Sequence, residues 1–144
     1  MKPSPLDLRL HHWGFVVGDI HASASGFVTS LGAVWDGVVY EDPQQSVKVT
    51  FLTAGDSSSS MELVEPSSED SPVSLFLQER GGGLHHVCYE IEDIEAALAE
   101  LRERGALITK PPLPAVAFAG RRIAWVVTRQ KLLVELLEKT AQNG

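Results

Sequence analysis

The sequence predicts an α+β fold built from two tandem β-α-β-β-β modules. Histidine pairs open two similar segments, HHWGFVVGDI from residue 11 and HHVCYEIEDI from residue 85, which start 74 residues apart. A second similarity, between ELVE from residue 62 and ELLE from residue 135, has an offset of 73 residues. Similar segments at a nearly constant spacing indicate that one structural unit is duplicated. The two halves should therefore share one order of elements.

The first module is expected over residues 8–66. Asp19 is a suitable N-cap for a helix over 20–31, and Gly32 is a suitable residue to end it. The polar breaks at 41–45 and 55–59 separate segments that are rich in β-branched and aromatic residues. These segments predict strands over 8–17, 34–40, 46–53 and 60–65.

Residues 67–83 form a connector with a short helix. Ser71 and Pro72 are residues typical of an N-cap and a first helical position, and they precede the run VSLFLQE. Three consecutive glycines, residues 81–83, should end this helix.

The second module is expected over residues 84–139, and with the first it should make one domain. Asp93 should cap a helix over 94–104, which has Ile94, Leu98 and Leu101 on one stripe. Residues 111–114 (PPLP) read as a loop, and residues 129–131 read as a tight turn. The remaining apolar segments predict strands over 85–91, 106–109, 122–128 and 132–138.

Composition excludes several classes of function. The net charge of −7 disfavours nucleic acid and anionic membranes as partners, because both attract positively charged proteins. The single cysteine, Cys88, cannot form a disulfide within the chain, which favours an intracellular protein. No secretory signal and no long apolar run is recognisable, so we expect a cytoplasmic protein. A homodimer is the default expectation for its assembly.

The duplicated histidines and glutamates are the candidate site residues. Side chains alternate between the two sides of a strand, so only one histidine of each pair can face a given side. If His12 and His86 face the inside of the sheet, the bulky neighbours Trp13 and Phe15 pack toward the helix, and we therefore select these two histidines. Glu62 and Glu135 each lie between apolar residues, where a buried carboxylate needs compensation of its charge.

Two histidines and two glutamates make a set of ligands for a divalent metal ion. Taken singly, a strand histidine or glutamate is more often solvent-exposed or hydrogen-bonded than bound to metal, but the repeat favours a shared site for His12, Glu62, His86 and Glu135. Nitrogen and oxygen ligands suit Zn, Ni, Co, Mn or Fe. Four protein ligands leave up to two octahedral positions open, as a catalytic metal requires.

Two stretches of the sequence resemble a known family. They are residues 62–87, with ELVEP, EDSPV, FL and GLHHV in order, and residues 118–125 (FAGRRIAW). The chain resembles the vicinal oxygen chelate (glyoxalase/bleomycin resistance/dioxygenase) superfamily over about residues 8–139, and most closely its methylmalonyl-CoA epimerase and glyoxalase-like branch. The resemblance implies a glyoxalase-like fold, in which the paired modules form a cup-shaped mixed sheet around a metal. It also places the metal ligands at His12, Glu62, His86 and Glu135.

The chemistry implied by the resemblance is metal-assisted enolisation of a small acyl substrate. Glu135 is the first candidate for the base and Glu62 the second. Arg121 and Arg122 could bind a carboxylate or phosphate of the substrate bidentately, although a solvated hairpin explains them equally well. Epimerases of this branch usually carry a His-Pro-Lys turn where this chain has residues 127–131 (VTRQK).

Four functions remain open at this point. A methylmalonyl-CoA epimerase-like isomerase is the leading one, and a lyase resembling lactoylglutathione lyase (glyoxalase I) is the alternative. A metal-free drug- or ligand-binding resistance protein belongs to a different class, and so does an iron dioxygenase. In each of the enzyme cases the partner is a small-molecule substrate.

Overall fold

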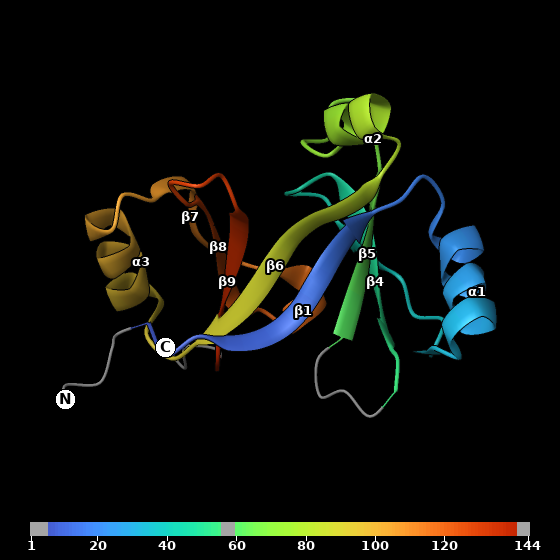
Figure 1. The fold of residues 1–144 in the computed structure, drawn as a ribbon, viewed down its shortest axis with the longest axis horizontal. Coiled ribbons are helices and arrows are strands. Elements are labelled where there is room, and N and C mark those ends of the chain that lie inside the picture. Colours follow the sequence, from blue (N-terminus) through green and yellow to red (C-terminus); the bar gives the residue numbers. More distant parts are fainter. Residues whose placement is uncertain (1–5, 56–59, 141–144) are drawn as a thin grey trace. The chain divides into compact units, whose positions relative to one another are not determined.

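A computed structural model describes residues 6–55 and 60–140 of the chain. The chain divides into two compact units, which we call the first unit (His12–His85) and the second unit (Met1–His11 with His86–Gly144). The fold class predicted above is confirmed, because each half follows the order strand, helix, strands (Figure 1). The first half has one short strand more than predicted.

The strands of the first unit form a mixed array in the order β2-β4-β5-β1, with β3 paired to β4. β5 pairs in parallel with β1 and antiparallel with β4, which places Gly14 and Phe51 on either side of Glu62. Helix α1 packs on one face, where Ile20, Leu52 and Leu63 are buried. The elements of this half are β1 (Arg9–Val16), α1 (Ile20–Leu31), β2 (Val34–Trp35), β3 (Tyr40–Asp42), β4 (Val47–Thr53), β5 (Ser60–Pro66) and α2 (Ser74–Arg80).

The strands of the second unit form an array in the order β6-β9-β8-β7. β6 pairs in parallel with β9, and β9 pairs antiparallel with β8. Helix α3 packs on one face of this array, where Ile94, Leu98 and Leu136 belong to the buried core. The elements are β6 (Gly83–Ile91), α3 (Ile94–Glu103), β7 (Leu107–Pro114), a single 3-10 turn (Val116–Phe118), β8 (Arg122–Val127) and β9 (Leu133–Glu138).

The N-caps of the two long helices are duplicated as predicted. An Asp19 carboxylate oxygen accepts a hydrogen bond from the Ala22 amide at 3.1 Å, and Asp93 does the same for the Ala96 amide at 3.0 Å. Gly32 ends α1 in the left-handed conformation, with φ of 65°. Each cap satisfies an amide that the first turn of a helix leaves without an intrahelical partner.

Replacing Asp93 with alanine should lower the free energy of unfolding by about 1 kcal/mol, the usual effect of losing a side-chain N-cap. Urea denaturation followed by circular dichroism measures the change. Asp93→Ser keeps an acceptor at the cap and should recover most of the loss. An alanine variant as stable as the wild-type protein would show that this cap contributes nothing to stability.

Three elements differ from the sequence-based expectation. The strand expected over 34–40 is split into β2 and β3, because residues 36–39 leave the ladder. β7 continues through the proline segment that was expected to be a loop, which is possible because β7 pairs with β8 at one end of the array. Helix α2 begins after Val73 without a side-chain cap, rather than at Ser71. Most of the break expected at 55–59 lies outside the described residues.

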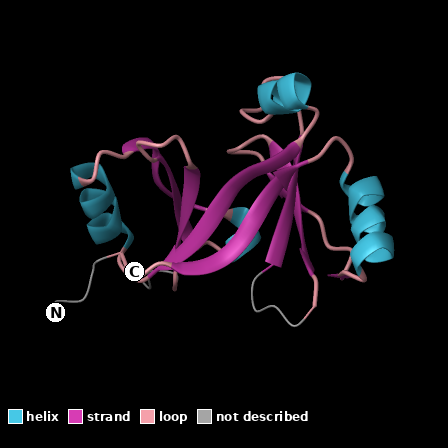
Figure 2. Ribbon diagram, in the orientation of Figure 1, coloured by secondary structure: helices cyan, strands magenta, loops and turns pink. Residues whose placement is uncertain are grey.

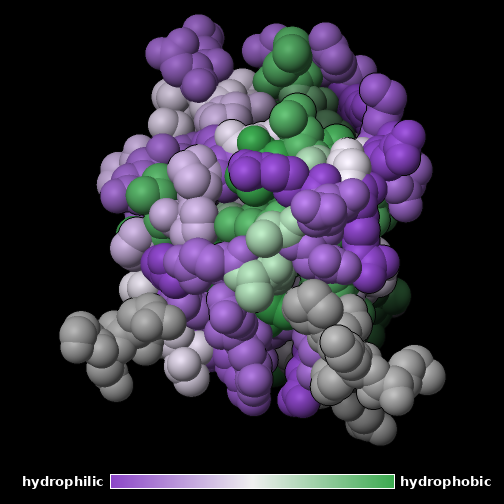
Figure 3. Space-filling view, turned by 90° about the vertical axis from the view of Figure 1, so that its left-hand side faces the viewer, coloured by the Kyte–Doolittle hydropathy of each residue, from purple (hydrophilic) through white to green (hydrophobic). Residues whose placement is uncertain are grey.

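One face of the molecule is mostly hydrophilic. Figure 2 distinguishes the helices from the strands, and Figure 3 views the side on which α3 lies in Figure 1. Hydrophilic residues dominate that face, and hydrophobic residues gather in a smaller central area. Among the described residues, no helix has the length and apolar composition needed to span a membrane.

Candidate metal and active site

His12 and Glu62 form a buried pair in the first unit. The parallel register aligns Gly14 of β1 with Glu62 of β5. His12 is two residues before Gly14, so its side chain lies on the same side of the strands as that of Glu62. His12 Nε2 is 3.4 Å from Glu62 Oε1, and the two side chains are 0% and 6% exposed. The ring of Phe51, which is opposite Glu62 on β4, meets the His12 ring edge-on at 5.7 Å. An imidazole and a carboxylate therefore meet in apolar surroundings.

His86 and Glu135 repeat this arrangement in the second unit. Here Cys88 of β6 is aligned with Glu135 of β9, and His86 is again one two-residue step away. His86 Nε2 is 3.5 Å from Glu135 Oε1, with side-chain exposures of 1% and 3%. The indole of Trp125 meets the His86 ring at 4.7 Å between centroids, in a T-shaped contact. An aromatic side chain in an apolar strand gives no sign in the sequence that it touches a candidate site residue, so this contact of Trp125 is visible only in the structure.

The geometry of both pairs suits a divalent metal ion. Separations of 3.4 and 3.5 Å are longer than a normal hydrogen bond from nitrogen to oxygen. Two ligand atoms about 2.1 Å from one ion would be about 3.0–3.4 Å apart, depending on the coordination angle. His12, Glu62, His86 and Glu135 are all buried, and each offers one atom of a type that binds metal. The chemistry of these donors therefore fits the ion that the sequence predicts.

The second glutamate of each repeat has a different role. Glu65 ends β5, and its Oε1 accepts a hydrogen bond from the Ile20 amide at 2.9 Å at the start of α1. Glu138 ends β9 and is 1% exposed, and its two oxygens accept hydrogen bonds from Arg122 at 2.9 and 2.8 Å. Alternation along the strands places these residues on the helix-covered faces, away from the faces of Glu62 and Glu135. The duplicated motif therefore supplies one candidate site residue and one structural residue in each half.

Arg122 is bound by two carboxylates of the second unit. Besides Glu138, it contacts Glu95 of α3 through Nη1 at 2.7 Å and Nη2 at 3.2 Å. The hydrogen bonds that Arg122 donates to Glu138, and then those it donates to Glu95, raise the pKa of Arg122 above its ordinary value. The hydrogen bond from Arg122 is the main cause that lowers the pKa of the Glu95 carboxyl. These contacts engage Nε, Nη1 and Nη2 of the guanidinium, and they connect β8, β9 and α3.

Arg121 is held on the other side of the same strands. Its Nε donates to the Glu138 carbonyl oxygen at 2.7 Å, and its Nη2 forms an ion pair with Glu90. His86, Cys88 and Glu90 are two residues apart along β6, so the three side chains lie on the same side of the array. Among the residues that the structure describes, the two arginines pair with Glu90, Glu95 and Glu138 and not with His86 or Glu135. Of the two arginines, Arg121 is the one whose carboxylate partner, Glu90, lies on the same side of β6 as His86.

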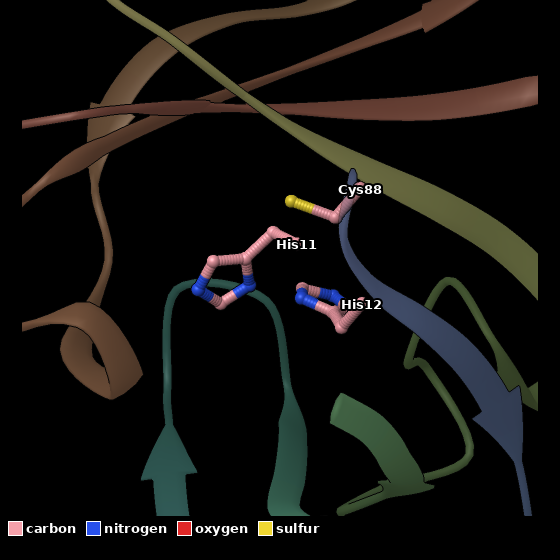
Figure 4. A group of neighbouring side chains, drawn as sticks. All are labelled: His11, His12 and Cys88. Atoms are coloured by element: carbon pink, nitrogen blue, oxygen red, sulfur yellow. The ribbon is translucent and has the colours of Figure 1, made fainter. Parts of the chain in front are cut away.

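The other histidine of each pair and the cysteine have packing partners. Cys88 is fully buried, and its sulfur lies within 4.8 Å of a ring nitrogen of His11 in the same unit (Figure 4). The His11 ring meets Phe118 edge-on at 5.6 Å. The His85 ring meets Phe76 of the connector helix at 5.0 Å. His11 and His85, the histidines not proposed as ligands, therefore each contact an aromatic side chain.

Comparison with known proteins identifies the family. Residues 11–125 match the model of the glyoxalase/bleomycin resistance protein/dioxygenase superfamily. An ethylmalonyl-CoA/methylmalonyl-CoA epimerase from Cereibacter sphaeroides is 35% identical over 119 residues, which cover 82% of this chain and 87% of that protein.

Solved structures agree with this match. The structure of a hypothetical protein from Bacillus halodurans C-125 is similar, with a TM-score of 0.82 and 33% identity. The match covers 96% of this chain and 99% of that protein's chain. A variant of Streptomyces coelicolor methylmalonyl-CoA epimerase, in complex with 2-nitronate-propionyl-CoA, has a TM-score of 0.80 at 27% identity, covering 92% and 98%. The chain therefore belongs to the glyoxalase/bleomycin resistance protein/dioxygenase superfamily.

Proposed function

We propose that this protein is a metal-dependent epimerase that acts on a short acyl-CoA thioester of the methylmalonyl-CoA type. The observation that carries the proposal is the duplicated buried pair of histidine and glutamate, present in a chain 35% identical to an ethylmalonyl-CoA/methylmalonyl-CoA epimerase. A sequestering protein has no need for two buried carboxylates beside imidazoles, because burying each carboxylate is unfavourable without a compensating charge.

The residues proposed to hold the ion are His12, Glu62, His86 and Glu135. Their two carboxylates neutralise a dication, and their mixed nitrogen and oxygen donors suit Zn, Ni, Co, Mn or Fe. When bound, such an ion supplies Lewis-acid stabilisation of the negative charge that develops on a substrate carbonyl oxygen.

The protein's own part in the reaction is the transfer of a proton. A Glu135 carboxylate oxygen takes the proton from the carbon between the thioester and the substrate carboxylate, and the electron pair of the broken C–H bond moves into the enolate. Return of a proton to the opposite face of that carbon gives the epimer. Glu62, the matching carboxylate of the other repeat, is the candidate donor for that face after it takes up a proton from water, while Glu135 releases its proton to water. The apolar neighbours of both glutamates limit the access of water.

The test is a stereochemical assay on purified protein loaded with each of the five metals in turn. One epimer of methylmalonyl-CoA is incubated in D₂O, and conversion to the other epimer is followed together with deuterium uptake at the α-carbon. We expect both with at least one of the metals. Absence of both signals with every metal would overturn the proposal.

A glyoxalase I-type lyase is the second candidate. Glu62 favours it, because a glutamate at this position resembles glyoxalase I, whereas epimerases of the family can carry glutamine there. The hemithioacetal of methylglyoxal and glutathione is therefore assayed beside methylmalonyl-CoA. Turnover of the hemithioacetal alone would select the lyase. For either enzyme we propose a cytoplasmic location. We also propose a homodimer, which light scattering of the purified protein can test.

Replacing His86 with alanine should reduce metal affinity by more than about 100-fold, since even the loss of a residue that only supports a ligand costs 10–100-fold. Elemental analysis after gel filtration should find nearly stoichiometric metal in the wild-type protein and little in the variant. His85→Ala is the matched control, because His85 packs against Phe76. Equal metal content in the two variants would contradict the assignment of His86.

A further inference from the structure

The edge strand β7 contains a bulge that changes the side on which its residues lie. Ile108 is opposite Val126 of β8, but Lys110 is opposite Trp125, so two steps along β7 correspond to one step along β8. Thr109 is the extra residue, and its hydroxyl donates to the Trp125 carbonyl oxygen at 3.2 Å. Without the bulge, Lys110 would lie on the same side as Ile108, which packs against the α3 core.

The bulge places Lys110 on the side of the His86–Glu135 pair. Residues directly opposite one another on paired strands share a side, and Trp125 is opposite both Lys110 and, on β9, Glu135. Two strand spacings separate the Lys110 and Glu135 backbones by about 10 Å, and an extended lysine side chain reaches about 6 Å. The Lys110 ammonium can therefore reach a small molecule held at Glu135.

Lys110 differs from the other cations of the second unit. Arg104, Arg121, Arg122 and Lys139 each pair with a carboxylate. Among the described residues of this unit, Arg9, Arg102, Arg129 and Lys131 are exposed. Lys110 is half-buried, and within residues 6–55 and 60–140 its side chain makes no ion pair or hydrogen bond. A half-buried ammonium group has three hydrogen-bond donors to satisfy. Those of Lys110 have no protein acceptor among the described residues, although carboxylates outnumber cations in this chain (net charge −7).

We propose that Lys110 is a substrate-binding residue that binds the free carboxylate of the acyl group, next to the carbon whose proton is exchanged. This inference rests on the proposed epimerase function and extends it to selectivity for a dicarboxylic acyl thioester. The reach of Lys110 favours a group near Glu135 over the distant phosphates of the CoA moiety. A bulge beside a candidate site suits this role, because bulges commonly redirect a side chain next to an active site.

The test compares binding of malonyl-CoA, which carries the carboxylate, with binding of propionyl-CoA, which lacks it. Isothermal titration of metal-loaded Lys110→Met protein should show malonyl-CoA bound at least about 10-fold more weakly than by the wild type, and propionyl-CoA bound within about 2-fold. Lys110→Arg should restore most of the preference for malonyl-CoA. Lys131→Met, which removes an exposed lysine of the same unit, should change neither affinity.

Other outcomes would overturn the proposal. An equal loss of affinity for both thioesters would indicate that Lys110 binds the CoA phosphates. No loss of affinity for either thioester would show that Lys110 is not part of the binding site. Free malonate, titrated into the wild-type and Lys110→Met proteins, separates this inference from the epimerase function. If malonate binds only the wild-type protein while no thioester is turned over, the anion site stands and the epimerase proposal fails. If wild-type protein binds neither malonate nor malonyl-CoA, the Lys110 site is refuted.

Discussion

Glu135→Gln should lower kcat/KM for epimerisation by about 10²–10⁴-fold, the range typical of losing a group that transfers a proton. Glutamine keeps the size of the side chain, and Glu135 is only 2% exposed, so a smaller residue would leave a cavity. The amide removes both the basic oxygen and one of the two negative charges proposed to balance the ion. Deuterium uptake from D₂O and metal content, measured on the same sample, separate these two losses.

Glu103→Gln is the matched control, because Glu103 is an exposed residue at the end of α3. It should change neither activity nor metal content. Glu62→Gln should retain more deuterium uptake than Glu135→Gln when the reaction starts from the epimer whose proton faces Glu135. If Glu62→Gln loses more uptake than Glu135→Gln with both epimers, the order of the two candidate bases is wrong.

Arg122→Met should lower the free energy of unfolding by about 3 kcal/mol, near the lower end of the range for breaking a buried ion pair. The reason lies in Glu138, whose side chain is 1% exposed and receives two hydrogen bonds from the guanidinium. Methionine fills part of the volume but leaves the charge of Glu138 without that partner. The Arg122 side chain is itself 26% exposed, which keeps the expected effect below the upper end of the range. Urea denaturation measures the loss.

Adding Glu138→Leu to Arg122→Met should recover part of that loss, because the double variant removes the buried charge together with its partner. Arg102→Met is the control for deleting an exposed arginine of α3 and should stay within about 0.5 kcal/mol of the wild type. A single Arg122→Met variant as stable as this control would mean that the network of Glu95, Arg122 and Glu138 adds no stability.

The repeat made much of this fold predictable from the sequence. Local signals, such as Asp19 and Asp93 as caps and Gly32 as a terminator, act within one turn of a helix and depend little on distant contacts. Strand parity selected His12 and His86, and the structure brings each within 3.5 Å of the glutamate of its own repeat. The shared metal is still a prediction, to be tested by elemental analysis.

Features that depend on pairing between strands were not predictable. Prolines normally interrupt strands, so the part of β7 that contains Pro111 and Pro112 was expected to be a loop, and only its edge position makes the strand possible. The bulge at Thr109 is a property of the register with β8 and leaves no local sequence signal. The contact of Trp125 with His86 likewise depends on which strands become neighbours.

The prolines of β7 limit how the protein can associate with other chains. Pro111, Pro112 and Pro114 have no amide hydrogen, so this border of the second unit presents an interrupted row of donors. An incoming strand from another molecule would find too few partners there to extend the ladder, which protects the border against fibrous aggregation. Self-association that adds strands at this border is therefore disfavoured, and a stable dimer would have to use side-chain surfaces elsewhere.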